Sequence, residues 1–220
     1  MEAHLPSERR GGSFMADPRV IKRAIDKIDS LNEDPRRGLP EDLFLFASRI
    51  TPMVNVDLLI KNERGQTLLT WRDDGYWRPG WHIPGGIIRY QESISERIRA
   101  VARTELGAEV AFRPTPLAIK EIMNPNRRVR GHFISFLYLC SLTTAPDNGL
   151  QYRSGQPLAN QWMWHATCPE NLIPVHEIYR EYIECSDARR KEALFPAEMP
   201  VQAWVVVGGR RKPLRAGSCS

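Results

Sequence analysis

Residues 84–107 read PGGIIRYQESISERIRAVARTELG, and this stretch joins a glycine turn to an amphipathic helix. Ser93, followed three residues later by Glu96, is typical of a capping box at the start of a helix. Apolar residues then recur at helical spacing until Gly107 ends the pattern. These residues are Ile94, Ile98, Val101, Ala102 and Leu106. The sequence therefore predicts a helix that begins after Ser93 and buries one face.

The glycine turn at residues 84–86 can adopt backbone angles that are closed to other residues, so its amides and carbonyls can face a cation or a phosphate. Glu105 lies at the edge of the apolar stripe and can turn toward this loop. The alternative is an ordinary amphipathic helix after a glycine turn, which a lone Gly-Gly or a lone Glu would favour. Here the spacing of four residues together matches the motif quoted in the next paragraph, and this match favours a functional site. They are Gly86, Glu92, Glu105 and Gly107.

The stretch resembles the Nudix box, G-x5-E-x7-R-E-U-x-E-E-x-G-U, where U is apolar. Ala100, Val101 and Thr104 stand where that family usually has Arg, Glu and Glu, whereas Glu105 retains the last metal-binding carboxylate. The resemblance implies a loop, helix and loop that hold magnesium against a nucleoside diphosphate linked to another group. It also implies an α/β/α sandwich with a mixed β-sheet, where propensity alone predicts only an α+β fold.

The chain is expected to form one domain at residues 39–190, with an extension at 1–38 and a tail at 191–220. In the extension, residues 1–17 are expected to be disordered, and the apolar spacing predicts a helix from Pro18 to about Leu31, followed by a linker at 32–40. Strands are predicted at 53–60, at 67–72, within 110–122, at 132–140 and from 162, and a final helix at 171 to about 188. Residues 201–207 are either a strand or part of the tail.

Composition narrows the class of protein. With 220 residues, 42% of them hydrophobic, the chain can bury one core. No apolar run approaches the length of a membrane span and the first residues lack the apolar core of a secretory signal, so we expect a cytoplasmic protein without membrane contact. The four cysteines show no C-x-x-C spacing, and reduced thiols are expected. The net charge of +5 is scattered and gathers toward the tails, which favours a solvated surface over nucleic-acid binding.

Within the Nudix family, residues from about 39 to 183 resemble the GDP-mannose mannosyl hydrolase branch, which breaks the bond between sugar and phosphate at carbon. The shared features are a degraded box that ends in Glu-Leu-Gly and three further segments. These segments are Thr51-Pro-Met-Val-Asn-Val-Asp57, Leu68-Leu-Thr-Trp-Arg72 and Gly80-Trp81-His-Ile-Pro-Gly-Gly86.

The resemblance implies roles for individual residues. Glu105 and the carbonyl of Gly85 would hold magnesium. Arg72 would contact the leaving diphosphate, although it is also compatible with an ordinary surface ion pair. Asp57 would lie near the sugar or merely bond to the backbone, and Phe44 would either stack on the nucleotide base or belong to the core.

Two departures from the branch affect the site. The branch has an Arg directly after its double glycine, whereas this chain has Arg89 two residues later, on the same face if the segment is extended. The branch also carries a Gln and a catalytic His in the loop that corresponds to residues 142–161, which contains no His here. Gln156 is the candidate metal ligand from this loop. His165 is the candidate base and His132 a second one that would lie by the substrate, although such histidines are more often structural.

The sequence therefore predicts a Mg²⁺-dependent hydrolase that releases a nucleoside diphosphate and a sugar from a small nucleotide sugar. One alternative is attack at phosphorus, and another is a module that binds a nucleotide sugar without hydrolysing it. We also expect a homodimer in which Phe44, on an apolar run at 43–47 interpreted as an edge strand, completes the partner's site.

Overall fold

The helix predicted after Ser93 is α3, Ile94–Leu106, in a computed structural model that describes residues 17–185, 204–207 and 210–213. The capping box is present, because the Glu96 amide donates to Ser93 Oγ at 3.2 Å and the Ser93 amide donates to the Glu96 carboxylate at 2.8 Å. Gly107 ends the helix with a left-handed φ of 62°. The buried residues of α3 include most of the predicted stripe. The prediction of this helix is confirmed.

The larger sheet is mixed, as the resemblance implied. Its strands pair in the order β4-β1-β7-β5, and β6 also pairs with β7. Only β1 and β7 run parallel, and the other pairs are antiparallel. The bounds are β1 Met53–Ile60, β4 Gly85–Ile87, β5 Val110–Phe112, β6 Ala118–Met123 and β7 His132–Leu142.

A second, antiparallel sheet has the order β3-β2-β8. Its strands are β2 Thr67–Arg72, β3 Gly80–His82 and β8 Trp162–His165. The long loop between β7 and β8 contains one 3₁₀ turn, η2 Asn148–Leu150. All strands that the sequence predicted between residues 53 and 165 are present, and the segment at 110–122 is divided into β5 and β6.

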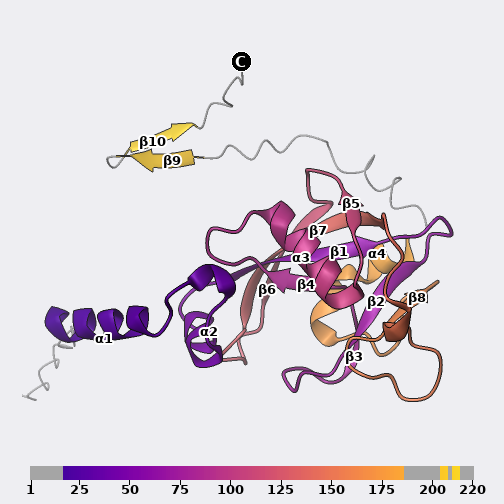
Figure 1. Cartoon of the computed structure of the whole chain (residues 1–220), viewed down its shortest axis with the longest axis horizontal. Coiled ribbons are helices and arrows are strands. Elements are labelled where there is room, and N and C mark those ends of the chain that lie inside the picture. Colours follow the sequence, from indigo (N-terminus) through magenta and orange to yellow (C-terminus); the bar gives the residue numbers. More distant parts are fainter. Residues whose placement is uncertain (1–16, 186–203, 208–209, 214–220) are drawn as a thin grey trace, which may run out of the picture.

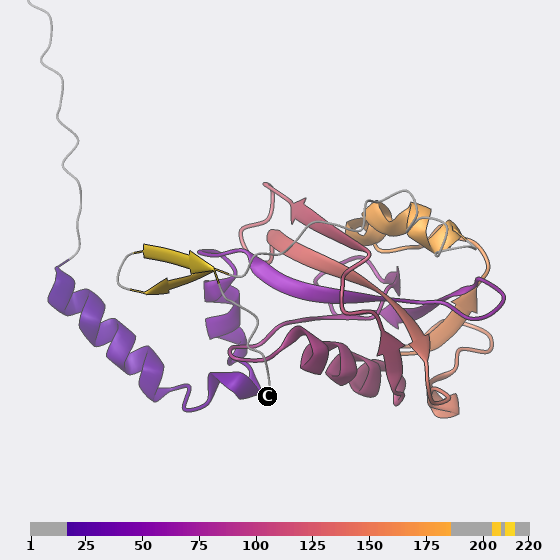
Figure 2. The same ribbon diagram turned by 90° about the horizontal axis from the view of Figure 1, so that it is seen from above.

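Two apolar layers enclose the larger sheet, which Figure 2 shows between α3 and the C-terminal helices. Alternation along β1 serves both layers, since Leu58 packs in the cluster with α3 and Leu59 in the cluster with α4. Asp57 is buried on β1 between the apolar Val56 and Leu58. The architecture is the predicted α/β/α sandwich, and it brings one buried carboxylate to the middle of the sheet.

The N-terminal elements precede this sandwich. The predicted first helix is α1, Pro18–Ser30, which has no buried residue and stands away from the sheets in Figure 1. The predicted linker contains a 3₁₀ turn, η1 Pro35–Arg37. The apolar run at 43–47 was interpreted as an edge strand, and this is wrong, because it lies in helix α2, Glu41–Ala47. Two acidic residues, Glu41 and Asp42, fill its first turn after Pro40, so local signals favour the helix.

The C-terminal part is less regular than predicted. Up to residue 185, the single helix expected from 171 to about 188 is replaced by a 3₁₀ segment, η3 Pro174–Tyr179, and a short helix, α4 Arg180–Glu184, and residues 186–188 lie outside the described part of the chain. Strands β9, Trp204–Val207, and β10, Arg210–Pro213, form an antiparallel pair. The disorder predicted for residues 1–17 concerns a segment that lies almost entirely outside the described residues. Along the described part of the chain, no helix combines the length and apolarity that crossing a bilayer requires.

Candidate functional site

The double glycine lies between a strand and a helix. Gly85 stands opposite Asp57, and Gly86 opposite Val56, in the antiparallel pair of β4 and β1. A Cβ on Gly85 would overlap the Asp57 carboxylate, and a Cβ on Gly86 would come within 2.8 Å of Val101 on α3. Glycine is therefore required at both positions by close approach, and the turn backbone is fixed between β1 and α3.

Glu105 turns from α3 toward this loop, as predicted. Its Oε1 accepts a hydrogen bond from the Gly85 amide at 3.1 Å, and its Oε2 accepts one from the Thr70 hydroxyl at 3.0 Å. His82 Nε2 lies 3.5 Å from the same Oε2. The carboxylate is thus held in place by groups from the glycine turn, β2 and β3, and its side chain remains 18% exposed.

His82 is a site residue that the sequence reasoning missed. Its Nδ1 lies 2.8 Å from the Thr70 carbonyl, and this ring nitrogen carries the proton because a carbonyl only accepts. His176 lies across from it at a ring distance of 5.8 Å and accepts a hydrogen bond from the Ile83 amide at 3.0 Å. Burial holds the pKa of His176 well below its usual range, so that ring is neutral. The available signal was the position of His82 inside the Trp-x-x-Pro-Gly-Gly segment.

Glu92, the other glutamate of the motif, stabilises the loop before α3. Its Oε2 accepts hydrogen bonds from Arg97 Nε at 2.8 Å and Arg97 Nη2 at 2.7 Å, and from the Arg89 amide at 2.9 Å. The Arg97 and Glu92 side chains are only 11% and 17% exposed. This ion pair locks the loop to the first turns of the helix, so Glu92 and Glu105 have different surroundings.

Asp57 is fully buried and hydrogen-bonded. Its carboxylate accepts from the Ser135 hydroxyl, from the Tyr179 hydroxyl at 2.8 Å and from the Asn55 amide at 3.2 Å. Burial raises the pKa of Asp57, and these hydrogen bonds only partly oppose the shift. The Asn55 Oδ1 atom is itself buried without a hydrogen-bond partner among the described residues. Asn55 and Asp57 both line the neighbouring cavity.

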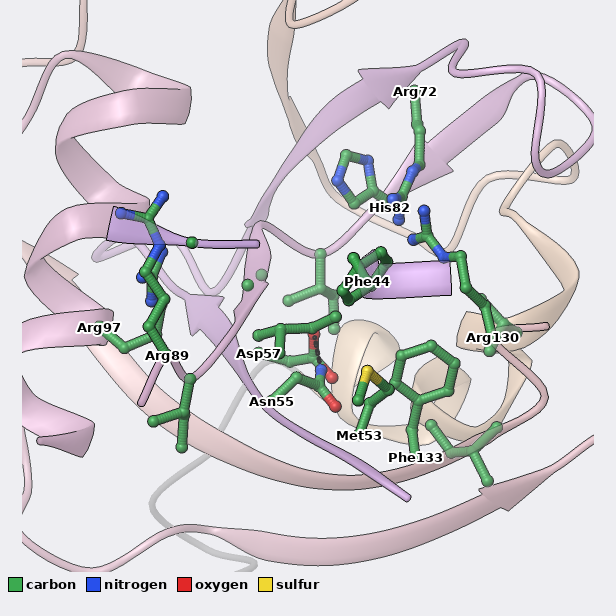
Figure 3. Close-up of a pocket in the computed structure, with 18 of the residues that line it drawn as sticks. Phe44, Met53, Asn55, Asp57, Arg72, His82, Arg89, Arg97, Arg130 and Phe133 are labelled. Carbon is green, nitrogen blue, oxygen red and sulfur yellow. Dashed lines mark hydrogen bonds between the residues drawn. The ribbon is translucent and has the colours of Figure 1, made fainter. Parts of the chain in front are cut away.

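A cavity of about 470 Å³ lies in front of these residues. Figure 3 shows an apolar side with Phe44, Met53 and Phe133, and arginine side chains at the flanks. The lining includes His82, Asn55, Asp57 and both glycines, together with Arg72, Arg89, Arg97 and Arg130. Glu105 lies directly behind the lining, in contact with Gly85. The cavity thus combines cationic, polar and apolar walls.

Three predicted residues line this cavity from other elements. Arg72, at the end of β2, forms an ion pair with Asp74 at 2.7 Å and still faces the cavity. Arg89 lines the opposite flank. Phe44 is half-buried on α2 and lines the cavity of its own chain, where the Arg130 guanidinium lies 5.8 Å from its ring centre. A second chain is therefore not needed to bring Phe44 to this wall.

Three other predicted residues lie outside the cavity lining. His165 is buried and packs edge-on against Trp81 at 4.7 Å, and burial lowers the pKa of its imidazole to about 4. His132 lies 3.1 Å from a Glu121 carboxylate oxygen on the neighbouring strand. Gln156 is exposed in the loop before β8. The structure does not bring these side chains to Glu105, and their proposed roles gain no support from their positions.

Comparison with known proteins gives a family match. The family model described as the NUDIX domain matches residues 51–181. The chain is also 33% identical over 80 residues to the low-salt glycan biosynthesis protein Agl8 of Haloferax volcanii, which corresponds to 36% of this chain and 51% of that protein. The chain thus spans about half the length of this curated relative.

Several solved structures are similar at low identity. A UDP-X diphosphatase is 20% identical with a TM-score of 0.47, over 83% of this chain and 88% of that one. The MutT protein of Methanosarcina mazei Go1 is 19% identical with a TM-score of 0.47, over 64% and 97%. A MutT NUDIX hydrolase of Burkholderia pseudomallei is 20% identical with a TM-score of 0.45, over 60% and 97%. At these scores the structures say nothing of the substrate of this chain.

Proposed function

The chain belongs to the Nudix hydrolase family, and from this premise we propose that it is a magnesium-dependent hydrolase of a nucleoside-diphosphate sugar. The products would be a nucleoside diphosphate and a sugar, as for a GDP-mannose-like substrate. The observation that carries the proposal is the cavity of about 470 Å³, which joins arginine side chains to an apolar wall beside the glycine turn. Arginines suit a diphosphate, and aromatic and apolar side chains suit a base.

The oxygen ligands near Gly85 would suit a magnesium ion whose remaining ligands are water and the phosphates of the substrate. Across the described residues, no group of three or more His, Cys, Asp or Glu side chains is arranged to hold a metal. Magnesium usually takes one or two carboxylates and fills its remaining positions with water and substrate phosphates. Glu105 supplies one carboxylate beside the Gly85 backbone, and Gln156 remains a proposed third donor. When bound, the ion would neutralise charge on the diphosphate.

The residues of the cavity have distinct proposed tasks. Arg72 and Arg89 would bind the diphosphate from opposite flanks and stabilise the charge that develops as it leaves. Phe44 would lie against the base. Asp57 and Asn55 line the cavity and would face the sugar.

His165 and His132 were the two histidines proposed as the general base, and both lie outside the cavity lining. A diphosphate is a good leaving group once its charge is neutralised, so a positioned water would suffice for slow turnover. A general base typically adds about 10²- to 10⁴-fold. We therefore expect a slow enzyme.

Hydrolysis in water labelled with oxygen-18 tests the proposal. Label in the sugar would support attack at carbon, and label in phosphate would support the alternative of attack at phosphorus. No turnover across a panel of nucleotide sugars, despite binding, would support a non-hydrolytic module. The similarity to the low-salt glycan biosynthesis protein Agl8 agrees with a substrate that carries a sugar.

We further propose that the protein is a cytoplasmic homodimer. The support is the apolar surface of α1, where Val20, Ile21 and Ile25 are exposed. Light scattering at micromolar concentration tests the dimer, and a monomer would remove the idea. Phe44→Ala should weaken nucleotide binding with little change in melting temperature, whereas an unstable variant with normal binding would assign Phe44 to the core.

A further inference from the structure

Arg130 lies in the turn between β6 and β7, in a backbone conformation that the surrounding structure imposes. Its φ is 52°, in the left-handed region that few residues other than glycine adopt. Its amide donates to Ser48 Oγ at 3.0 Å, and Ser48 is the residue that ends α2. The neighbouring Gly131 is also constrained, because a Cβ there would lie 2.6 Å from the Arg127 carbonyl oxygen. The turn therefore fixes where the Arg130 side chain begins.

The guanidinium of Arg130 lies against aromatic rings and forms no ion pair with a carboxylate of the described residues, although Asp74 lies near enough to act on its charge. It lies 4.4 Å from the centre of the Tyr76 ring and 5.8 Å from that of Phe44. Its Nε is buried without a hydrogen-bond partner, and no described carboxylate lies within ion-pair distance of it. Arg130 is half-buried, and a partly buried cation without an ion pair is less favourable in the free protein than a paired one. Such an arrangement is typical of a site that binds an anion.

Arg72 lies close enough to Arg130 to affect it electrostatically. Figure 3 shows the two guanidinium groups approaching each other above Phe44. Burial lowers the pKa of Arg130, repulsion from Arg72 lowers it further, and Asp74 opposes the shift. Asp74 already forms an ion pair with Arg72 at 2.7 Å, so a single carboxylate offsets the charge of two guanidinium groups. This wall of the cavity has a surplus positive charge.

We propose that Arg130 and Arg72 form a paired diphosphate-binding site, in which the rings of Tyr76 and Phe44 orient the Arg130 guanidinium. This inference rests on the proposed function for the identity of the ligand, but its chemistry requires only a phosphoanhydride. The planar guanidinium groups present parallel N–H donors that suit phosphate oxygens. The adjacent Phe44 would then contact whatever is attached to the diphosphate.

Isothermal titration of the full chain with inorganic pyrophosphate, GDP and guanosine tests the pair. Arg130→Gln should weaken binding of pyrophosphate and GDP about tenfold or more and leave guanosine unchanged, since one charge-assisted contact is lost. The matched control is Arg128→Gln, which removes an exposed charge outside the cavity lining and should change affinity less than twofold. Equal pyrophosphate affinity for Arg130→Gln and the natural protein would overturn the pair.

Melting temperature separates a binding role from a structural one. Arg130→Gln should melt at the same or a higher temperature without ligand, because a half-buried charge without an ion pair is removed, and should lose the rise that pyrophosphate gives. A lower melting temperature with an intact pyrophosphate response would overturn the inference. Binding of pyrophosphate through Arg130 without hydrolysis of any nucleotide sugar would refute the proposed function and uphold the pair. Normal hydrolysis of a nucleotide sugar and normal pyrophosphate binding by Arg130→Gln would uphold the proposed function and refute the pairing of Arg130 with Arg72.

Discussion

The two motif glutamates should respond differently to the same substitution. Glu105→Gln replaces a carboxylate that accepts from the neutral Gly85 amide and Thr70 hydroxyl. Glu92→Gln replaces one that accepts twice from a mostly buried Arg97. We expect the first variant to lose activity and keep most of its stability, and the second to lose more stability and keep more of its activity per folded molecule.

The magnitudes follow from these contacts. Hydrogen bonds to a charged group contribute about 1.5–3 kcal/mol and neutral ones about 1 kcal/mol, and glutamine retains one acceptor oxygen. Glu92→Gln should therefore cost about 2–3 kcal/mol and lower the melting temperature by about 5–10 °C in a domain of this size. Glu105→Gln should cost about 1 kcal/mol and lower it by about 2–4 °C. Its turnover should fall about a hundredfold, or about 2.7 kcal/mol of transition-state stabilisation.

The assay combines calorimetric melting with the release of nucleoside diphosphate during a magnesium titration. Near-normal magnesium-dependent turnover of Glu105→Gln would show that the metal assignment is wrong. If Glu92→Gln instead loses turnover as strongly while its melting temperature is unchanged, then Glu92 serves the chemistry and the argument from its Arg97 pair fails.

Three further predictions follow from the site. Arg72→Ala should lower kcat more than it raises KM, because its charge is needed most as the diphosphate departs, and a pure rise in KM would count against that role. Gly85→Ala should lower the free energy of unfolding by about 1–3 kcal/mol, since its Cβ would overlap Asp57, and an unchanged urea midpoint would contradict the close approach. The stability of His165→Gln should be less sensitive to acid than that of the natural protein. In the folded protein burial lowers the pKa of His165 to about 4, whereas in the unfolded chain the imidazole binds a proton below about pH 6.5. The free energy of unfolding of the natural protein should therefore fall as the pH is lowered from about 6.5 to about 4. A stability difference that is independent of pH would refute this, and turnover within about threefold of normal would agree with the position of His165 outside the cavity.

The fold was predictable where local pattern and packing agree. The capping box, the apolar stripe and Gly107 predicted α3, and the runs at residues 53–60 and 67–72 predicted β1 and β2. The run at 43–47 was misinterpreted because a short apolar segment has no clear period, and the acidic first turn at Glu41 and Asp42 was the better signal. The final helix was overextended because Pro174 begins a 3₁₀ segment instead.

The site was predictable where the chain itself supplies the spacing. Glu105 and Gly85 belong to one motif, and the structure brings them together. His82 reaches Glu105 through the pairing of β3 with β2, and Arg130 reaches the cavity through a left-handed turn packed on α2. The contact of Arg130 leaves no local pattern, because it joins segments that are distant in the sequence. His82 stands in the Trp-x-x-Pro-Gly-Gly segment, but that segment does not indicate the strand with which it pairs. The burial of His165 against Trp81 also depends on a contact between distant segments, so the sequence did not reveal it.

The α2 helix, which carries Phe44, precedes residue 51, where the family match begins. It contacts the later chain through polar links, since the Tyr76 hydroxyl donates to Glu41 at 2.5 Å and the Arg130 amide donates to Ser48. The glycine turn and Glu105 lie in a different stretch of the chain. Under the proposed function, recognition and chemistry are therefore encoded separately. An exchange of the segment before residue 51 between relatives would alter the preferred nucleotide and leave the hydrolytic centre intact, which is a route by which new specificities arise through recombination.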